Sequence, residues 1–223
     1  MSPAAAAPEV LIAGATGLVG RELTRLLLAH TPRPRLRALV RRMPQSADAR
    51  VQWQVVDFAR LPALPRATEA YCCLGTTIRQ AGSQAAFKAV DLDAVRAFAQ
   101  AARAAGAQRF AVVSALGASA RSPNFYSRVK GEMEAAVAGL GFEQVVIARP
   151  SLLGGDRASL DQPSRSGEKL ALWLSGPIAG LIPKRMRPID AATVARGMIA
   201  ALQQPRPGVR IVESGELQDL GRA

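Results

Sequence analysis

The chain has 223 residues, of which 49% are hydrophobic and 21% charged, a balance typical of a single globular domain. The formal net charge is +12, but the basic residues are mostly scattered arginines and only 4% of residues are aromatic, which argues against dedicated nucleic-acid binding. No apolar run has the length of a membrane span, and with one histidine and two cysteines, adjacent at Cys72 and Cys73, we expect no metal site.

An unbroken apolar run from Val10 to Ala13 predicts a strand that is buried on both faces. Gly14, Gly17 and Gly20 follow at a spacing of three, and apolar residues then recur at helical spacing over 18–29. A strand, a glycine-rich turn and a helix in this order are the context of a dinucleotide-binding fingerprint. The alternative is a small-residue turn of the kind that any α/β protein can contain.

The glycines match the requirements of that fingerprint. Gly14 permits the tight turn, Gly17 lets the backbone approach a pyrophosphate, and Gly20 lets the helix pack close to the strand. The pyrophosphate would lie at the helix N-terminus, where backbone N–H groups point at it. The turn residues that we expect to hold the cofactor are Gly14, Thr16, Gly17, Leu18 and Val19.

Strands and helices alternate along the rest of the chain. Predicted strands cover 35–40, 51–56, 69–74, 109–113 and 142–148, and predicted helices cover 85–105 and 125–140. This alternation predicts an α/β fold built as a Rossmann-type doubly wound parallel sheet. We expect one NAD(P)-binding domain over 1–223, with a flexible N-terminus at 1–8 that lacks the features of a signal peptide, as in a cytoplasmic protein.

The regular alternation of strands and helices ends at Pro150. Residues 151–190 are punctuated by proline and glycine, and we expect them to form a small C-terminal substrate lobe with a short helix at 168–174. A helix at 191–203 and a strand at 209–213 are predicted next. The polar tail at 214–223 is expected to be flexible.

Two arginines follow the second predicted strand, at the position that distinguishes the two nicotinamide cofactors. An NAD-preferring site usually places a carboxylate there, on the ribose 2′-hydroxyl. Arg41 and Arg42 would instead attract a 2′-phosphate, because a guanidinium matches its charge and geometry. This favours NADP(H) over NAD(H); the alternative is that both are solvated loop charges in an arginine-rich chain.

Tyr126 and Lys130 are four residues apart in a predicted helix, so their side chains share one face. Ser114 follows the strand at 109–113, at the sheet edge where ligands bind in open α/β folds. The Lys130 ammonium would favour the phenolate of Tyr126, which could exchange a proton with a carbonyl or alcohol oxygen held by Ser114. The alternative is an ordinary exposed helix face.

The turn at 14–20, Ser114, the Tyr126–Lys130 pair and the segment 149–151 together resemble an extended or atypical short-chain dehydrogenase/reductase. The segments 72–77, 90–93 and 112–117 are similar to the branch of Tat-interacting oxidoreductase-like proteins, also described as NAD(P)-binding or nucleoside-diphosphate-sugar epimerase-like. The likeness covers roughly residues 9 to 200. It implies a Rossmann fold, a nicotinamide cofactor and a catalytic set of Ser114, Tyr126 and Lys130.

The resemblance also assigns residues to parts of the cofactor. It implies that Asp57 and Phe58 hold the adenine, although Asp57 could equally cap the end of the third strand. Leu74, Gly75 and Thr76 would pass beneath the adenosine ribose. Tyr126 and Lys130 are expected at the nicotinamide end, and Pro150 is also expected to bind the cofactor.

These features favour an NADP(H)-dependent oxidoreductase that transfers a hydride to or from a small carbonyl or alcohol substrate, with Tyr126 as acid and base. A non-catalytic NADPH-binding sensor and an epimerase or dehydratase acting on a sugar nucleotide are the alternatives. The short region after Pro150 leaves little chain to grip a sugar nucleotide. We expect a small-molecule substrate, no membrane or nucleic-acid partner, and a monomer or homodimer.

Overall fold

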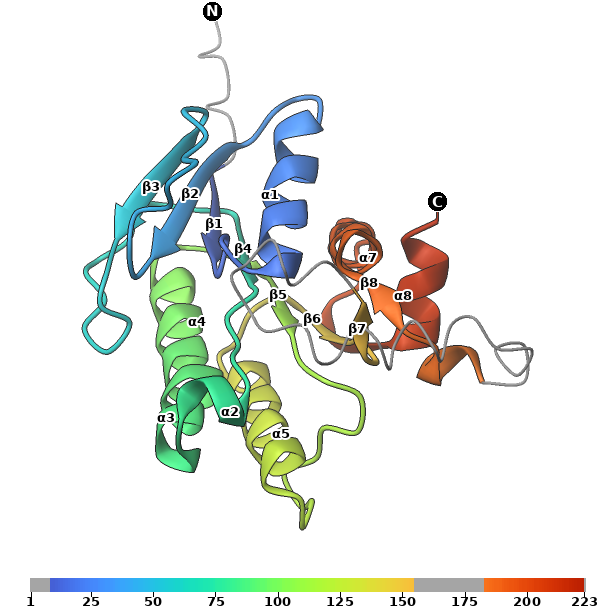
Figure 1. Ribbon diagram of the computed structural model, residues 1–223. Coiled ribbons are helices and arrows are strands. Elements are labelled where there is room, and N and C mark those ends of the chain that lie inside the picture. The colour runs from blue at the N-terminus through green and yellow to red at the C-terminus, as the bar shows by residue number, and fades with distance from the viewer. Residues whose placement is uncertain (1–8, 155–182, 223) are drawn as a thin grey trace, which may run out of the picture.

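The core of the protein is a parallel sheet with helices on both faces. The computed structural model describes residues 9–154 and 183–222 (Figure 1). The main sheet has seven strands in the order β3-β2-β1-β4-β5-β6-β9, all parallel. These strands are β1 (Glu9–Ala13), β2 (Arg35–Val40), β3 (Val51–Val55), β4 (Glu69–Cys72), β5 (Arg109–Val113), β6 (Gln144–Arg149) and β9 (Gly208–Glu213).

The strand order confirms the predicted doubly wound sheet. From β1 the chain winds outward through β2 and β3, then returns to β4 on the other side of β1 and continues to β9 at the opposite edge. The direction of winding therefore reverses between β1 and β4. Ligands of such sheets bind outside the carboxyl ends of the strands at this reversal.

Helices cover both faces of the sheet, and β1 explains why. Val10 and Ile12 join one core cluster, whereas Leu11 and Ala13 join the other, so β1 is buried on both faces. The first cluster includes residues of α1 and α7, and the second includes residues of α4 and α5, on the opposite side in Figure 1. The helices are α1 (Leu18–Ala29), α2 (Ile78–Ala81), α3 (Gln84–Lys88), α4 (Val95–Ala104), α5 (Phe125–Ala138), α7 (Ala191–Gln203) and α8 (Ser214–Leu220).

The long helix predicted at 85–105 is broken into different helical forms. It consists of α3, a π-helix at Ala89–Ala94 and α4. Ser83 caps α3, since its Oγ accepts a hydrogen bond of 3.1 Å from the Ala86 N–H. The alanine-rich segment contains no local sign of the π-turn, which carries a fully buried aspartate, Asp91.

The expectation of a flexible tail at 214–223 is wrong for 214–220, which forms α8. Leu217 is fully buried there, and α8 lies so close to α7 that a Cβ at Gly197 would come within 2.9 Å of the Leu217 carbonyl oxygen. Arg196 of α7 also donates a 2.6 Å hydrogen bond to the Gly221 carbonyl. Burial of one leucine and a close helix contact outweigh the polar composition of this segment.

The substrate-side region is described only at its ends. Beyond β6, β7 (Leu153–Gly154) pairs in parallel with β8 (Ile189–Asp190), which leads into α7. The predicted helix at 168–174 and the flexible N-terminus at 1–8 lie outside the described residues. Among the helices of 9–154 and 183–222, none combines the length and apolarity needed to cross a membrane.

Candidate cofactor and active site

The glycine-rich turn joins β1 to α1 at the reversal point of the sheet. Gly14 has a φ of +83°, and a Cβ there would lie 2.4 Å from the Cys73 carbonyl carbon, just beyond the end of β4. A Cβ at Gly20 would lie 2.1 Å from the Gly14 carbonyl oxygen. Both glycines are therefore required by contacts between backbone segments of the protein itself.

Gly17 differs from these two glycines. It is the N-cap of α1, and among the described residues no side chain caps the first N–H groups of that helix. A Cβ at Gly17 would meet only the Gly14 carbonyl oxygen, at 3.4 Å, which is an ordinary contact. The protein's own packing does not demand glycine here, whereas an anion approaching the helix N-terminus would.

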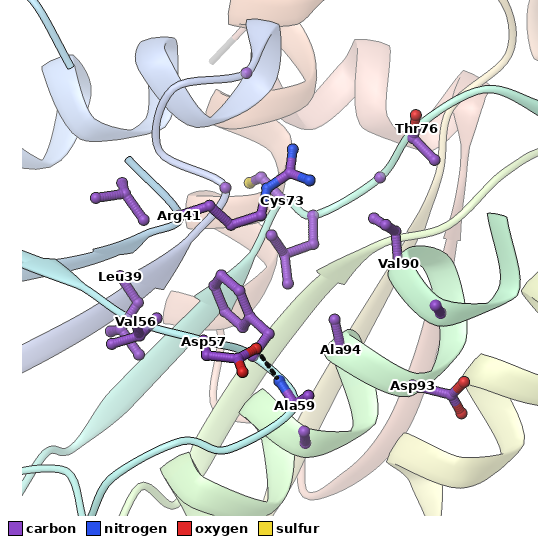
Figure 2. A pocket seen from close by; sticks show the side chains of 18 of the residues that line it. Leu39, Arg41, Val56, Asp57, Ala59, Cys73, Thr76, Val90, Asp93 and Ala94 are labelled. Carbon is purple, nitrogen blue, oxygen red and sulfur yellow. Dashed lines mark hydrogen bonds between the residues drawn. The ribbon is translucent and has the colours of Figure 1, made fainter. Parts of the chain in front are cut away.

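A cavity of about 1210 Å³ opens at this turn. It runs from the ends of β2 and β3, near Leu39 and Asp57, toward Thr76 and Val90 (Figure 2). The volume and the position over the reversal of the sheet suit a dinucleotide. The residues predicted for cofactor binding that line it are Gly14, Thr16, Gly17, Arg41, Asp57, Phe58, Leu74, Gly75 and Thr76.

The adenosine end of the cavity carries Arg41 and Asp57. Arg41 is exposed at the end of β2 and forms no ion pair with any residue that the structure describes. One oxygen of Asp57 accepts a 2.9 Å hydrogen bond from the Ala59 N–H, drawn in Figure 2. Asp57 therefore caps the end of the third strand, which is one of the two interpretations of the sequence. It also lines the cavity.

The remaining predicted cofactor residues do not line this cavity. Val19 is buried in the core beneath α1, Leu18 begins that helix partly buried, and Arg42 is exposed next to Arg41. Pro150 is buried, and its carbonyl accepts a 3.0 Å hydrogen bond from the Leu116 N–H. The predicted catalytic residues also lie beyond the cavity lining.

Lys130 is buried on α5 and forms an ion pair with Asp91 of the π-helix, with 2.8 Å between Nζ and Oδ1. The other oxygen of Asp91 accepts a 2.9 Å hydrogen bond from the Thr76 N–H. A Cβ at Gly75 would lie 3.5 Å from Asp91 Oδ1 and 3.9 Å from Lys130 Nζ. Gly75 and Thr76 therefore connect the cavity to the buried Lys130–Asp91 pair.

Tyr126 lies one helical turn before Lys130 on the same face of α5. Its ring is partly buried and rests 5.5 Å from the ring centroid of Phe87, which is fully buried on α3. Asn124 caps this helix, because its Oδ1 accepts a 3.1 Å hydrogen bond from the Ser127 N–H. The Asn124 cap and the contact with Phe87 together fix the position of the Tyr126 phenol.

Ser114 is buried at the end of β5, and its hydroxyl donates a 2.5 Å hydrogen bond to Glu134 on α5. Arg149 of β6 donates hydrogen bonds of 2.9 and 2.6 Å to the two carboxylate oxygens of Glu134. It donates a third, of 3.2 Å, to Glu213. The hydrogen bonds to Glu134 raise the pKa of Arg149. Because a hydroxyl has one proton, Ser114 offers lone pairs, rather than a donor, to any further partner.

Asp91 and Glu134 were not among the predicted site residues. Glu134 could have been found by continuing the helical face, since it stands four residues beyond Lys130. Asp91 belongs to a segment noted only for its family resemblance, and nothing local shows that its carboxylate turns inward. Asp91 and Asp93 both occur in the otherwise apolar segment 89–95, and only the structure shows that Asp91 is the buried one.

Both cysteines are free thiols, and Cys72 is buried as the sequence predicts, whereas Cys73 is partly buried and lines the cavity. Burial raises the pKa of Cys72 to about 12 and raises that of Cys73 still further. Both therefore stay protonated, and a thiol is a poor nucleophile. No group of three or more His, Cys, Asp or Glu suited to a metal ion occurs in the part of the chain that the structure describes.

Comparisons with known proteins show the family to which the chain belongs. A family model described as NAD(P)H-binding matches residues 14–153, more than half of the chain. The protein HTATIP2 of Rattus norvegicus is 34% identical over 96% of this chain and 89% of its own length. The protein fmp52, mitochondrial, of Emericella nidulans is 33% identical over 76% of both chains.

Solved structures share the fold at low sequence identity. MoeE5 in complex with UDP-glucose and NAD superposes with a TM-score of 0.69 at 14% identity, covering 92% of this chain and 75% of that one. UDP-glucuronic acid 4-epimerase from Bacillus cereus in complex with NAD gives 0.66 at 13% identity, covering 92% and 77%. The chain therefore belongs to the NAD(P)H-binding family, as a homologue of HTATIP2 with the fold of the short-chain dehydrogenase/reductase and epimerase superfamily.

Proposed function

We propose that the protein is an NADP(H)-dependent oxidoreductase that transfers a hydride to or from a small carbonyl or alcohol substrate, with Tyr126 as acid and base. The observation that carries the proposal is the continuous path from the glycine-rich turn, through Gly75 and Thr76, to the buried Lys130–Asp91 pair. It links a dinucleotide-sized cavity to the helix face that carries Tyr126.

The residues present fit a nicotinamide dinucleotide. The N-terminus of α1 and the open space above Gly17 suit a pyrophosphate, and Arg41, which has no ion pair among the described residues, suits a 2′-phosphate. Lys130 would hold the ribose hydroxyls on the nicotinamide side. Once bound, the nicotinamide supplies or accepts the hydride.

The protein's own groups would then handle the proton. The phenol of Tyr126 would give its proton to a carbonyl oxygen in reduction, and its phenolate would take a proton from an alcohol in oxidation. To hold the substrate oxygen, Ser114 would have to turn its hydroxyl proton from Glu134 to that oxygen. The contact with Phe87 would hold the tyrosine in place during the exchange.

Cofactor preference is tested by Arg41→Ala. We expect the dissociation constant for NADPH to rise by at least about tenfold, because hydrogen bonds to charged groups contribute about 1.5–3 kcal/mol. The constant for NADH should change little, since NADH lacks the 2′-phosphate. Titration of cofactor fluorescence against protein measures both constants.

Arg42→Ala is the matched control for that experiment. Arg42 carries the same charge and is also exposed, but it does not line the cavity. Its removal should leave both constants nearly unchanged. Equal affinities for NADPH and NADH in the wild type, unchanged by Arg41→Ala, would contradict the assignment of NADP(H).

A non-catalytic NADPH sensor is the second candidate, and one observation favours it. The Ser114 hydroxyl and the Lys130 ammonium both have partners within the protein, Glu134 and Asp91. A screen of small carbonyl compounds that follows NADPH absorbance separates the two functions. Turnover of any carbonyl compound supports the oxidoreductase. Tight NADPH binding without any change in NADPH absorbance supports the sensor.

Epimerisation of a sugar nucleotide is less well supported. Among the structural neighbours, MoeE5 binds UDP-glucose and the Bacillus cereus protein is a UDP-glucuronic acid 4-epimerase, and this protein covers only 75% and 77% of their chains. The cytoplasmic location remains a prediction. Because the fungal relative is labelled mitochondrial, a mitochondrial location is the alternative. A monomer or homodimer likewise remains a prediction, to be measured by light scattering.

A further inference from the structure

The seven-stranded sheet has two edge strands, β3 and β9, and their outer sides differ. At β3 the carbonyl of Asp48 accepts a 3.1 Å hydrogen bond from the Val51 N–H and a 3.0 Å one from the Trp53 indole. The outer side of β9 has no such contact with any residue that the structure describes. An open row of backbone N–H and C=O groups is a template on which another strand can pair.

The hydrogen bonds of β9 show which of its backbone groups are free. The Gly208 N–H donates a 2.8 Å hydrogen bond to the carbonyl of Glu143, just before β6. In a parallel ladder alternate residues of a strand bond to the neighbouring strand, so Gly208 and every second residue after it face β6. Val209 and Ile211 therefore direct both backbone groups outward. Glu213 directs its N–H outward, while its carbonyl begins α8 as the N-cap.

The side chains of these outward residues add an apolar surface. Val209 and Ile211 are 50% and 44% exposed. Their partners on β6, Val145 and Ile147, belong to the core cluster of α4 and α5, so Val209 and Ile211 lie on that face of the sheet. Val212, on the other face, is buried in the cluster that includes α7 and α8. The open edge of β9 therefore adjoins exposed apolar side chains on one face only.

We propose that β9 is a dimer interface, at which a second copy of the chain adds its own β9 antiparallel to this one, across a two-fold axis at Ile211. Ile211 then lies opposite Ile211 of the second copy, and the two residues exchange both N–H···O bonds. Val209 lies opposite Glu213 of the second copy, whose N–H binds the Val209 carbonyl. The exposed apolar side chains of both copies join into one strip, and the two sheets become continuous.

The residues around β9 select this register. An axis moved by half a residue pair toward the strand start would place Arg210 opposite its own copy, and like charges directly opposite are destabilising. It would also place Glu213 opposite Pro207, which has no N–H to donate. An axis moved toward the strand end would bring Ile211 opposite Glu213 and the start of α8 into the ladder. The axis at Ile211 avoids all three faults.

Charge favours a second copy as the occupant of this edge. Arg206, just before β9, is exposed and forms no ion pair with any residue that the structure describes. In the proposed register it comes beside the end of β9 in the second copy. Glu213 and Glu216 lie there, with side chains that are 44% and 42% exposed. The two-fold axis forms this contact twice, and such complementary charges fix the orientation of an interface.

The first test is the mass of the protein in solution. Light scattering at high micromolar protein should give twice the mass of one chain for the wild type and the mass of one chain for Ile211→Lys. The lysines would place two like charges opposite each other at the axis. Val55→Lys is the matched control, since Val55 is 58% exposed on the other edge strand, β3, and should leave the dimer intact.

The second test is the register. The Cα atoms of a hydrogen-bonded antiparallel pair are about 5.5 Å apart, within the span of about 4.4–6.8 Å that a disulfide bridges. Ile211→Cys should therefore form a covalent dimer on mild oxidation, seen on a non-reducing gel. Val209→Cys is the matched control, because Val209 and its copy are four residues apart along the ladder, about 13 Å. Wild-type protein gives the background from Cys72 and Cys73.

A wild type with the mass of one chain would overturn the proposal, and so would a dimer that persists in Ile211→Lys. Loss of the dimer in Val55→Lys would place the interface at β3 and likewise overturn it. Equal cross-linking of Ile211→Cys and Val209→Cys would contradict the axis at Ile211. None of these measurements uses cofactor or substrate, so the outcome is independent of the proposed reductase activity.

Discussion

Tyr126→Phe is expected to abolish hydride transfer while NADPH binding is retained. Phenylalanine keeps the ring that contacts Phe87 and removes only the hydroxyl, so helix and cofactor cavity should be preserved. General acid–base catalysis by a positioned group contributes typically about a hundred- to ten-thousandfold in rate. A loss of this size in kcat with an unchanged NADPH dissociation constant would support Tyr126 as the proton donor.

The control is Ser127→Ala, which removes a hydroxyl from the next position of α5. The Ser127 backbone N–H is bound by the helix cap, whereas its side chain is on a different face from Tyr126 and Lys130. Its rate should stay close to that of the wild type. If Tyr126→Phe turned over a substrate as fast as the wild type, the tyrosine mechanism would be wrong.

Gly20→Ala and Gly17→Ala are expected to damage different properties, although they are three residues apart in one turn. A Cβ added at Gly20 would have to stand 2.1 Å from the Gly14 carbonyl oxygen, so the backbone must move. Overpacking of a well-packed interior costs about 1–3 kcal/mol and sometimes more. Gly20→Ala should therefore lower the free energy of unfolding by at least that amount, measured by urea denaturation without cofactor.

Gly17→Ala should leave that free energy of unfolding nearly unchanged, because its Cβ meets only one atom at an ordinary distance. It should instead weaken NADPH binding by at least about tenfold, since the methyl group would obstruct a pyrophosphate at the α1 N-terminus. Fluorescence titration measures the binding constant. Normal NADPH affinity in Gly17→Ala would show that the pyrophosphate does not lie at this turn.

Local patterns in the sequence were sufficient for the fold class and for several residues that line the candidate site. The apolar run before Gly14 and the glycine spacing depend only on neighbouring residues, and so does the pairing of Tyr126 with Lys130 along one helix. Strand ends such as Arg41 and Thr76 could be placed because all strands of the sheet run in one direction. Their carboxyl ends then gather at one edge.

The partners of the predicted residues could not be obtained in this way. Ser114 binds Glu134 across a separation of 20 residues, and Lys130 meets Asp91 from another helix. No local preference marks the π-turn that turns Asp91 inward or the close helix contact that orders α8. These features arise from contacts between distant segments, which propensity does not encode.

The sequence by itself determined a doubly wound sheet, a glycine-rich turn for a dinucleotide and a tyrosine–lysine pair, because each depends on short-range periodicity and spacing. The tertiary structure alone decided which side chains those groups contact. It placed a carboxylate against Lys130 and another against Ser114, since only packing of the helices on the sheet brings these side chains within hydrogen-bonding distance.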